Sequence, residues 1–129
     1  MIRILLAEDE EAMRVYLARA LENAGFAVVP VGCGTDALPH LEAAACGATH
    51  FDLLLTDIVM PELDGIELAQ RCSELSPATK IMFITGFAGV TLRSNRNAPD
   101  ARVLSKPFHL RDLVLEVRRI FGQAETLSI

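Results

Sequence analysis

Short apolar segments alternate with amphipathic ones along most of the chain. Residues 2–7 are nearly all apolar, as expected of a central parallel strand that is covered on both faces. Residues 10–24 follow with apolar side chains at helical spacing, and Gly25 stands where a helix commonly ends. The pattern continues with strands predicted at 26–31, 51–56, 80–85 and 103–104, and with helices predicted at about 35–45, after the turn 57–65 as far as about 75, and at 109–121.

Two prolines and one polar segment modify this pattern. Pro30 lies in the second predicted strand, and because proline has no N–H to donate, that strand is predicted at an edge of the sheet. Pro39 lies near the first turn of the second predicted helix and is expected to bend or shorten it. Residues 86–100 are rich in glycine and asparagine, so one short, mobile helix or none is expected there. Five alternations of strand and helix predict an α/β fold with a parallel sheet covered on both faces.

The size and composition fit one globular domain. The chain has 129 residues, of which 51% are hydrophobic and 22% charged. We predict a domain over residues 1–122 and a short polar tail over 123–129. No apolar run is long enough for a membrane span, and the first residues lack the features of a signal peptide, so a cytoplasmic protein is expected. The three cysteines have no metal-ligand spacing and are expected to be free thiols.

Charge is unevenly distributed along the chain. Residues 1–79 carry 4 Lys+Arg and 13 Asp+Glu, whereas residues 80–129 carry 8 and 4. An acidic site in the first part and a basic face in the second would produce this division, and a chance distribution of solvated charge is the alternative. The acidic total, without a basic run, predicts that nucleic acid is not a partner.

Polar side chains follow four of the predicted strands, and ligands of parallel sheets bind at the carboxyl ends of strands. The first strand leads into Glu8 and Asp9, the third into Asp57, the fourth into Thr85 and the fifth into Lys106. Three converging carboxylates repel one another, and a hard divalent cation such as Mg²⁺ removes that repulsion. The lysine can pair with a phosphate, and the threonine hydroxyl can donate to an added anion. The sequence therefore predicts a metal and phosphate site at this edge.

One of the carboxylates in such a site can also act as a nucleophile. An aspartate can accept a phosphoryl group as an acyl phosphate, with a metal and a lysine neutralising the charge. Asp57 is favoured because it precedes a loop containing Pro61 and Gly65, so its carboxylate is expected to be the most accessible of the three. A single aspartate at a strand end is usually a cap or turn residue, but the joint occurrence on four strand ends favours a functional site.

In combination, several segments of the chain resemble the receiver domain of bacterial response regulators. The resemblance covers residues 2 to about 121 and rests on four segments, at 5–9, 57–65, 83–86 and 105–108. It implies the flavodoxin-like (βα)5 three-layer fold, with a parallel sheet of strand order 2-1-3-4-5.

The resemblance also implies how metal and phosphate are bound. Asp57 would be the phosphoacceptor, and Mg²⁺ would be held by Glu8, Asp9, Asp57 and the backbone carbonyl of Val59. Lys106 would bind the phosphoryl oxygens, and the backbone at Val59 and at Gly86 would contact the phosphate.

One position departs from the family pattern. The switch of a receiver usually pairs the hydroxyl, here Thr85, with an aromatic residue or histidine three residues before the lysine. This chain has Val103 there, which cannot swing a ring between buried and exposed positions. We therefore expect the switch to act by ordering or disordering residues 86–100.

The function implied is that of a single-domain two-component response regulator. A histidine kinase or histidine phosphotransfer protein would phosphorylate Asp57, and the protein would catalyse only this step and slow autodephosphorylation. Only eight residues follow Phe121, so output through protein–protein contact is expected, from a monomer. A narrower likeness, over 60–69, 81–87 and 103–107, is to stand-alone receivers that control cell-cycle proteolysis. It implies the ClpX unfoldase of the ClpXP protease as a partner, with the unphosphorylated form as the active adaptor.

Four alternatives stay open. The chain could serve the phosphorelay of a hybrid histidine kinase. A phosphatase with an aspartate nucleophile would need a second acid two residues on, where this chain has Val59. A flavin- or nucleotide-binding domain would need a phosphate loop after the first strand, where this chain has four consecutive acids, residues 8–11. A receiver that no longer accepts phosphate is disfavoured by the intact acids.

Overall fold

The computed structural model describes residues 1–47, 50–85, 102–105 and 109–122, with the backbone alone for Thr85 and residues 102–105. Within this part of the chain, five parallel strands form one sheet of order β2-β1-β3-β4-β5. The strands are β1 (Arg3–Ala7), β2 (Ala27–Val31), β3 (Leu53–Asp57), β4 (Lys80–Thr85) and β5 (Arg102–Ser105). The helices are α1 (Glu11–Asn23), α2 (Gly34–Ala45), α3 (Gly65–Leu75) and α4 (Leu110–Ile120).

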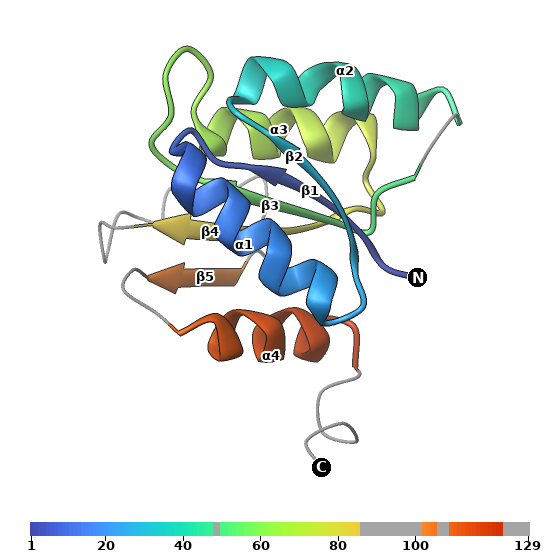
Figure 1. Cartoon of the computed structure of the whole chain (residues 1–129). Coiled ribbons are helices and arrows are strands. Elements are labelled where there is room, and N and C mark those ends of the chain that lie inside the picture. Colours follow the sequence, from blue (N-terminus) through green and yellow to red (C-terminus); the bar gives the residue numbers. More distant parts are fainter. Residues whose placement is uncertain (48–49, 86–101, 106–108, 123–129) are drawn as a thin grey trace.

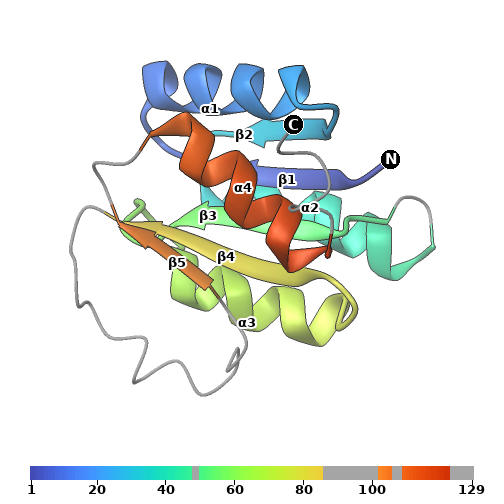
Figure 2. The same cartoon turned by 90° about the horizontal axis from the view of Figure 1, so that it is seen from below.

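The helices cover both faces of the sheet. Helices α2 and α3 lie on one face, and α1 and α4 lie on the other (Figure 1, Figure 2). The predicted α/β parallel sheet is thereby confirmed, with the order 2-1-3-4 for its first four strands and with β5 pairing with β4 through its backbone. The helix considered for residues 86–100 and the tail predicted at 123–129 lie outside the described residues.

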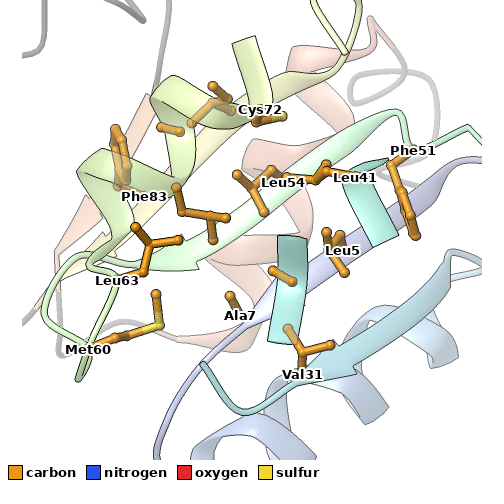
Figure 3. Close-up of a cluster of buried hydrophobic side chains, with 14 of the residues drawn as sticks. Leu5, Ala7, Val31, Leu41, Phe51, Leu54, Met60, Leu63, Cys72 and Phe83 are labelled. Atoms are coloured by element: carbon orange, nitrogen blue, oxygen red, sulfur yellow. The ribbon is translucent and has the colours of Figure 1, made fainter. Parts of the chain in front are cut away.

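The apolar strands have two buried faces because successive side chains point to opposite sides of a sheet. From β1, Leu5 and Ala7 join a core cluster beneath α2 and α3, which Figure 3 shows in close-up. Ile4 and Leu6 join a second cluster, beneath α1 and α4. Each fully buried leucine or isoleucine contributes about 1.5–3 kcal/mol to stability, so these strands supply much of the driving force for folding.

The two prolines behave differently from each other. Among the described strands, β2 lies at the sheet edge, as Pro30 predicts, and pairs with β1. The expectation that Pro39 shortens its helix is wrong, because α2 includes Pro39 within its 12 residues, and the expected bend stays a prediction. The exposed proline costs a backbone hydrogen bond, but the same helix buries Ala37 and Leu41 completely against the core. That burial outweighs the local cost.

A glycine follows each of two helices, and at Gly25 this confirms the prediction. Gly25 follows α1 with φ 99° and Gly122 follows α4 with φ 70°, a left-handed conformation that favours glycine. At the other end of a helix, Asp64 caps α3, and its carboxylate accepts a hydrogen bond from the Glu67 N–H at 2.9 Å. In the part of the chain that the structure describes, none of the helices combines the length and apolar character that a membrane crossing needs.

Candidate functional site

Three carboxylates meet at the carboxyl edge of the sheet. One oxygen from each of Glu8, Asp9 and Asp57 lies within 4.8 Å of the others. They come together because β1 pairs directly with β3, with Ala7 opposite Thr56, so the residues that follow each strand emerge side by side. The structure thus brings together the three acids that the sequence places at strand ends.

The three acids differ sharply in exposure. Glu8 is 0% exposed and Asp57 is 7% exposed, whereas Asp9 is open to solvent. The expectation that Asp57 has the most accessible carboxylate is therefore wrong. Asp57 is still part of the β3 ladder, opposite Ile84 of β4, and is buried there. Among the three acids, Asp9 is the one that lies open to solvent.

Glu8 is held firmly at the bottom of the cluster. Its N–H donates to the Val31 carbonyl at 3.1 Å, and its carboxylate accepts from the Glu10 N–H, also at 3.1 Å. The Arg14 guanidinium donates to the Glu8 carbonyl oxygen at 2.9 Å. Gly32 makes room for this arginine, since a β-carbon at position 32 would lie 3.3 Å from its Nη1. Together, these contacts fix the direction of the buried carboxylate.

The loop after Asp57 returns closely onto the strand end. Ile58 donates to the Ile84 carbonyl at 3.3 Å and accepts from the Gly65 N–H at 2.8 Å. A β-carbon on Gly65 would collide with the Asp57 carbonyl oxygen, so this position requires glycine. Between these anchors, the Val59 side chain is 55% exposed beside the acids. The role predicted for the Val59 carbonyl as a metal ligand stays a prediction.

The cluster is suited to a hard divalent cation. Burying one carboxylate fully and placing two others beside it is unfavourable without positive charge nearby. Mg²⁺ prefers oxygen ligands, binds through a few carboxylates and keeps several waters, which matches one open acid and two covered ones. The donor set and its geometry therefore fit a magnesium ion. A neighbouring aspartate in such a site can act as a nucleophile toward a phosphoryl group.

The other predicted site residues are only partly described. Thr85 ends β4, and its backbone lies opposite Ser105 of β5, but its side chain is outside the described part. Val103 lies opposite Phe83, again known for its backbone alone. Lys106 and Gly86 lie outside the described residues. The switch and the phosphate-binding lysine therefore stay predictions.

Arg14 was missed by the sequence analysis. Its place on α1 marks it as one more polar residue on an amphipathic helix, and nothing local connects it to Glu8, six residues earlier. The available signal was Gly32, a small residue directly after the edge strand, but its meaning depends on the pairing of β1 with β2.

The sheet, its helices and the acid cluster define a receiver domain. Residues 4–118 match the family "Response regulator receiver domain", and the chain belongs to that family. It is similar to the "Response regulator receiver protein CpdR" of Brucella abortus (strain 2308), with 56% identity over 121 residues that cover 93% of this chain and 97% of that protein.

A second relative and a solved structure are also similar to this chain. The chain is 34% identical over 124 residues to the "Sensor kinase CckA" of the same organism, covering 95% of this chain but 13% of that kinase. Among solved structures, the response regulator receiver protein of Sinorhizobium medicae WSM419 is similar with a TM-score of 0.83 and 31% identity, covering 96% of this chain and 97% of that one.

Proposed function

We propose that this chain is a single-domain response regulator whose Asp57 accepts a phosphoryl group. The observation that carries the proposal is the meeting of Glu8, Asp9 and Asp57 within 4.8 Å at the edge of a receiver sheet. Its likeness to the receiver protein CpdR, over 97% of that protein's length, supports the response-regulator role.

In the proposed reaction, the Asp57 carboxylate oxygen attacks the phosphorus of a phosphohistidine or a small phosphodonor. A P–O bond forms to Asp57, the bond from phosphorus to the donor breaks, and the electron pair leaves with the donor. Glu8, Asp9, Asp57 and the Val59 carbonyl would hold Mg²⁺, which supplies positive charge to the transferring oxygens. The Glu8 carboxylate, which accepts from the Glu10 N–H, would hold one ligand oxygen in place, and Lys106 would hold the phosphoryl oxygens.

We do not propose that the protein turns over substrates as a phosphatase. Such an enzyme needs a general acid two residues after the nucleophile, and Val59 has no proton to give. We propose that the protein catalyses its own phosphorylation and slow autodephosphorylation only.

We propose a histidine kinase or a histidine phosphotransfer protein as the phosphoryl donor. On the likeness to CpdR, we propose the ClpX unfoldase as the target. The unphosphorylated protein would bind it, as a monomer in the cytoplasm. The likeness to a segment of a sensor kinase supports a second candidate, service in a hybrid-kinase phosphorelay. Binding of wild-type, beryllofluoride-treated and Asp57→Ala protein to purified ClpX distinguishes them. The adaptor role requires that beryllofluoride lowers binding by the wild type and leaves Asp57→Ala unaffected.

The phosphoacceptor is tested by intact mass after incubation with acetyl phosphate and Mg²⁺. Wild-type protein should gain one phosphoryl group, and omission of Mg²⁺ or the substitution Asp57→Asn should abolish the gain. Asp36→Asn, an exposed aspartate on α2, is the matched control and should label as wild type does. Full labelling of Asp57→Asn contradicts the assignment.

A further inference from the structure

The loop between β3 and α3 contains a non-glycine residue in the left-handed conformation. Glu62 has φ 69°, and the Leu63 N–H donates to the Pro61 carbonyl oxygen at 2.8 Å. This i to i+2 hydrogen bond around a residue with positive φ makes a γ-turn of the rare, strained kind. A residue with a β-carbon keeps such a conformation only where its surroundings enforce it.

The amino-terminal end of α2 supplies that enforcement. The Thr35 hydroxyl donates to a carboxylate oxygen of Glu62 at 3.0 Å, and its oxygen also lies 3.1 Å from the Cys33 sulfur. Gly34 allows α2 to approach, because a β-carbon there would lie 2.5 Å from the Leu63 carbonyl oxygen. A side chain 27 residues away along the chain therefore holds the centre of the turn.

The turn sits in the segment that borders the acid cluster. It follows Val59 and Met60 directly, and on both sides buried side chains anchor it, with Met60 7% and Leu63 8% exposed. Figure 3 shows Met60 and Leu63 at the loop side of the core cluster that also contains Ala7 and Val31. With its two apolar anchors fixed, the loop has its remaining freedom at the turn. Glu62 lies between these two anchors, and Val59 lies three residues before it in the same short loop.

We propose that Thr35 and Glu62 are positioning residues of the metal centre. The Thr35 hydroxyl holds Glu62 in the left-handed turn, and the turn fixes the loop that carries the Val59 carbonyl. Without the hydrogen bond the turn relaxes toward negative φ, and the loop loses the arrangement that suits Mg²⁺. This inference rests on the proposed function, since it concerns the same metal centre.

The first test removes the hydroxyl and then restores it. Thr35→Val keeps the shape of the side chain, and we expect it to weaken Mg²⁺ binding about threefold to tenfold, the range of one net hydrogen bond. Thr35→Ser should return the affinity to within about twofold of wild type. Isothermal titration with Mg²⁺ gives the affinity, and the labelling rate with acetyl phosphate at subsaturating Mg²⁺ should fall in the same order.

The neighbouring Asp36→Ala is the matched control. It removes a favourable charge from the first turn of the same helix and so lowers helix stability without touching Glu62. An equal loss of Mg²⁺ affinity, relative to wild type, in Asp36→Ala and Thr35→Val would show that helix stability is responsible. That result would overturn the positioning role.

The second test separates the hydrogen bond from the backbone strain. Glu62→Ala loses the carboxylate but keeps a β-carbon, so it should weaken Mg²⁺ binding at least as much as Thr35→Val. Glu62→Gly also loses the carboxylate, but glycine adopts positive φ without penalty, so its affinity should stay within about twofold of wild type. In the Glu62→Gly background, Thr35→Val should then have no further effect.

Failure of this inference and failure of the proposed function give different results. Wild-type protein that neither binds Mg²⁺ nor takes up phosphate overturns the proposed function. Normal binding and labelling by the wild type, together with wild-type affinity in Thr35→Val, overturns the positioning role alone.

Discussion

Gly65, the first residue of α3, lies so close to the main chain of Asp57 that a β-carbon at position 65 would overlap the Asp57 carbonyl oxygen. The Gly65 N–H is used as well, in its hydrogen bond to the Ile58 carbonyl oxygen at 2.8 Å. The chain thus leaves the sheet after Asp57 and returns against it within eight residues. One glycine therefore serves both the packing of α3 and the placement of the proposed phosphoacceptor.

Substituting this glycine should be costly. In Gly65→Ala the loop must shift away from β3, and we expect the free energy of unfolding to fall by about 1–3 kcal/mol, with slower labelling of Asp57. Urea denaturation measures the loss. Gly25→Ala is the control, because Gly25 has positive φ but open space around its α-carbon, and should cost about 1 kcal/mol. A smaller loss for Gly65→Ala than for Gly25→Ala would contradict the steric account.

Removing Asp9 should separate repulsion from metal binding. Without metal, Asp9→Ala relieves part of the repulsion on Glu8 and Asp57, so its thermal midpoint in EDTA should equal or exceed that of wild type. With Mg²⁺, wild type should gain stability by linkage and Asp9→Ala should gain less. Thermal unfolding over a Mg²⁺ titration tests both points. Glu11→Ala, an exposed acid on α1 outside the cluster, should respond to Mg²⁺ as wild type does, and an unchanged response in Asp9→Ala would exclude Asp9 as a ligand.

Much of the fold follows from local sequence pattern, whereas element boundaries depend on pairing. The apolar run at 51–56 predicts a strand, but β3 spans Leu53–Asp57. Phe51 is buried outside the strand, where the Arg3 guanidinium lies 5.0 Å from its ring centre. Asp57 is polar, and it joins the ladder because it lies opposite Ile84. Hydrophobicity shows which residues are buried, and hydrogen bonding between strands decides which belong to the ladder.

The candidate site divides in the same way. The three acids could be predicted because each directly follows a strand and parallel strands end at one edge. Their supporting residues could not. Arg14 reaches Glu8 only once α1 is packed beside β2, and Thr35 reaches Glu62 only once α2 is packed beside α3. These residues come close only in the tertiary fold, so no local sequence pattern predicts the contacts between them.

Cys72 should make stability depend on pH in the alkaline range. Burial raises the pKa of its thiol to about 12, although a hydrogen bond with Thr79 acts in the opposite direction. The folded state then keeps a proton that the unfolded state loses, so stability is unaffected below about pH 9 and falls as pH rises from there toward 12, by about 1.4 kcal/mol per pH unit. Urea unfolding at pH 8, 9 and 10 should show this slope in wild type.

Two variants test whether Cys72 is the cause. Cys72→Ala should remove that contribution and flatten the slope, whereas Cys46→Ala, at an exposed thiol, should keep it. Equal slopes in the three proteins would show that Cys72 does not contribute. As an independent measurement, an alkylating reagent should modify Cys46 in the folded protein and Cys72 only after unfolding.

Arg118 should act as a structural link between α4 and α1. Its Nη2 donates to the Ala24 carbonyl at the end of α1, 3.1 Å away, whereas the neighbouring Arg119 pairs with Glu116 on the surface of its own helix. We expect Arg118→Ala to lower the free energy of unfolding by about 1 kcal/mol, because the Ala24 carbonyl loses its cap and the arginine stem loses its packing. Arg119→Ala should cost about 0.5 kcal/mol or less, as surface pairs of this spacing do.

Urea denaturation in low and high salt distinguishes the two residues. The cost at Arg118 should be nearly independent of salt, whereas the small cost at Arg119 should vanish. A cost at Arg118 that disappears with salt would show that its charge matters more than its contact.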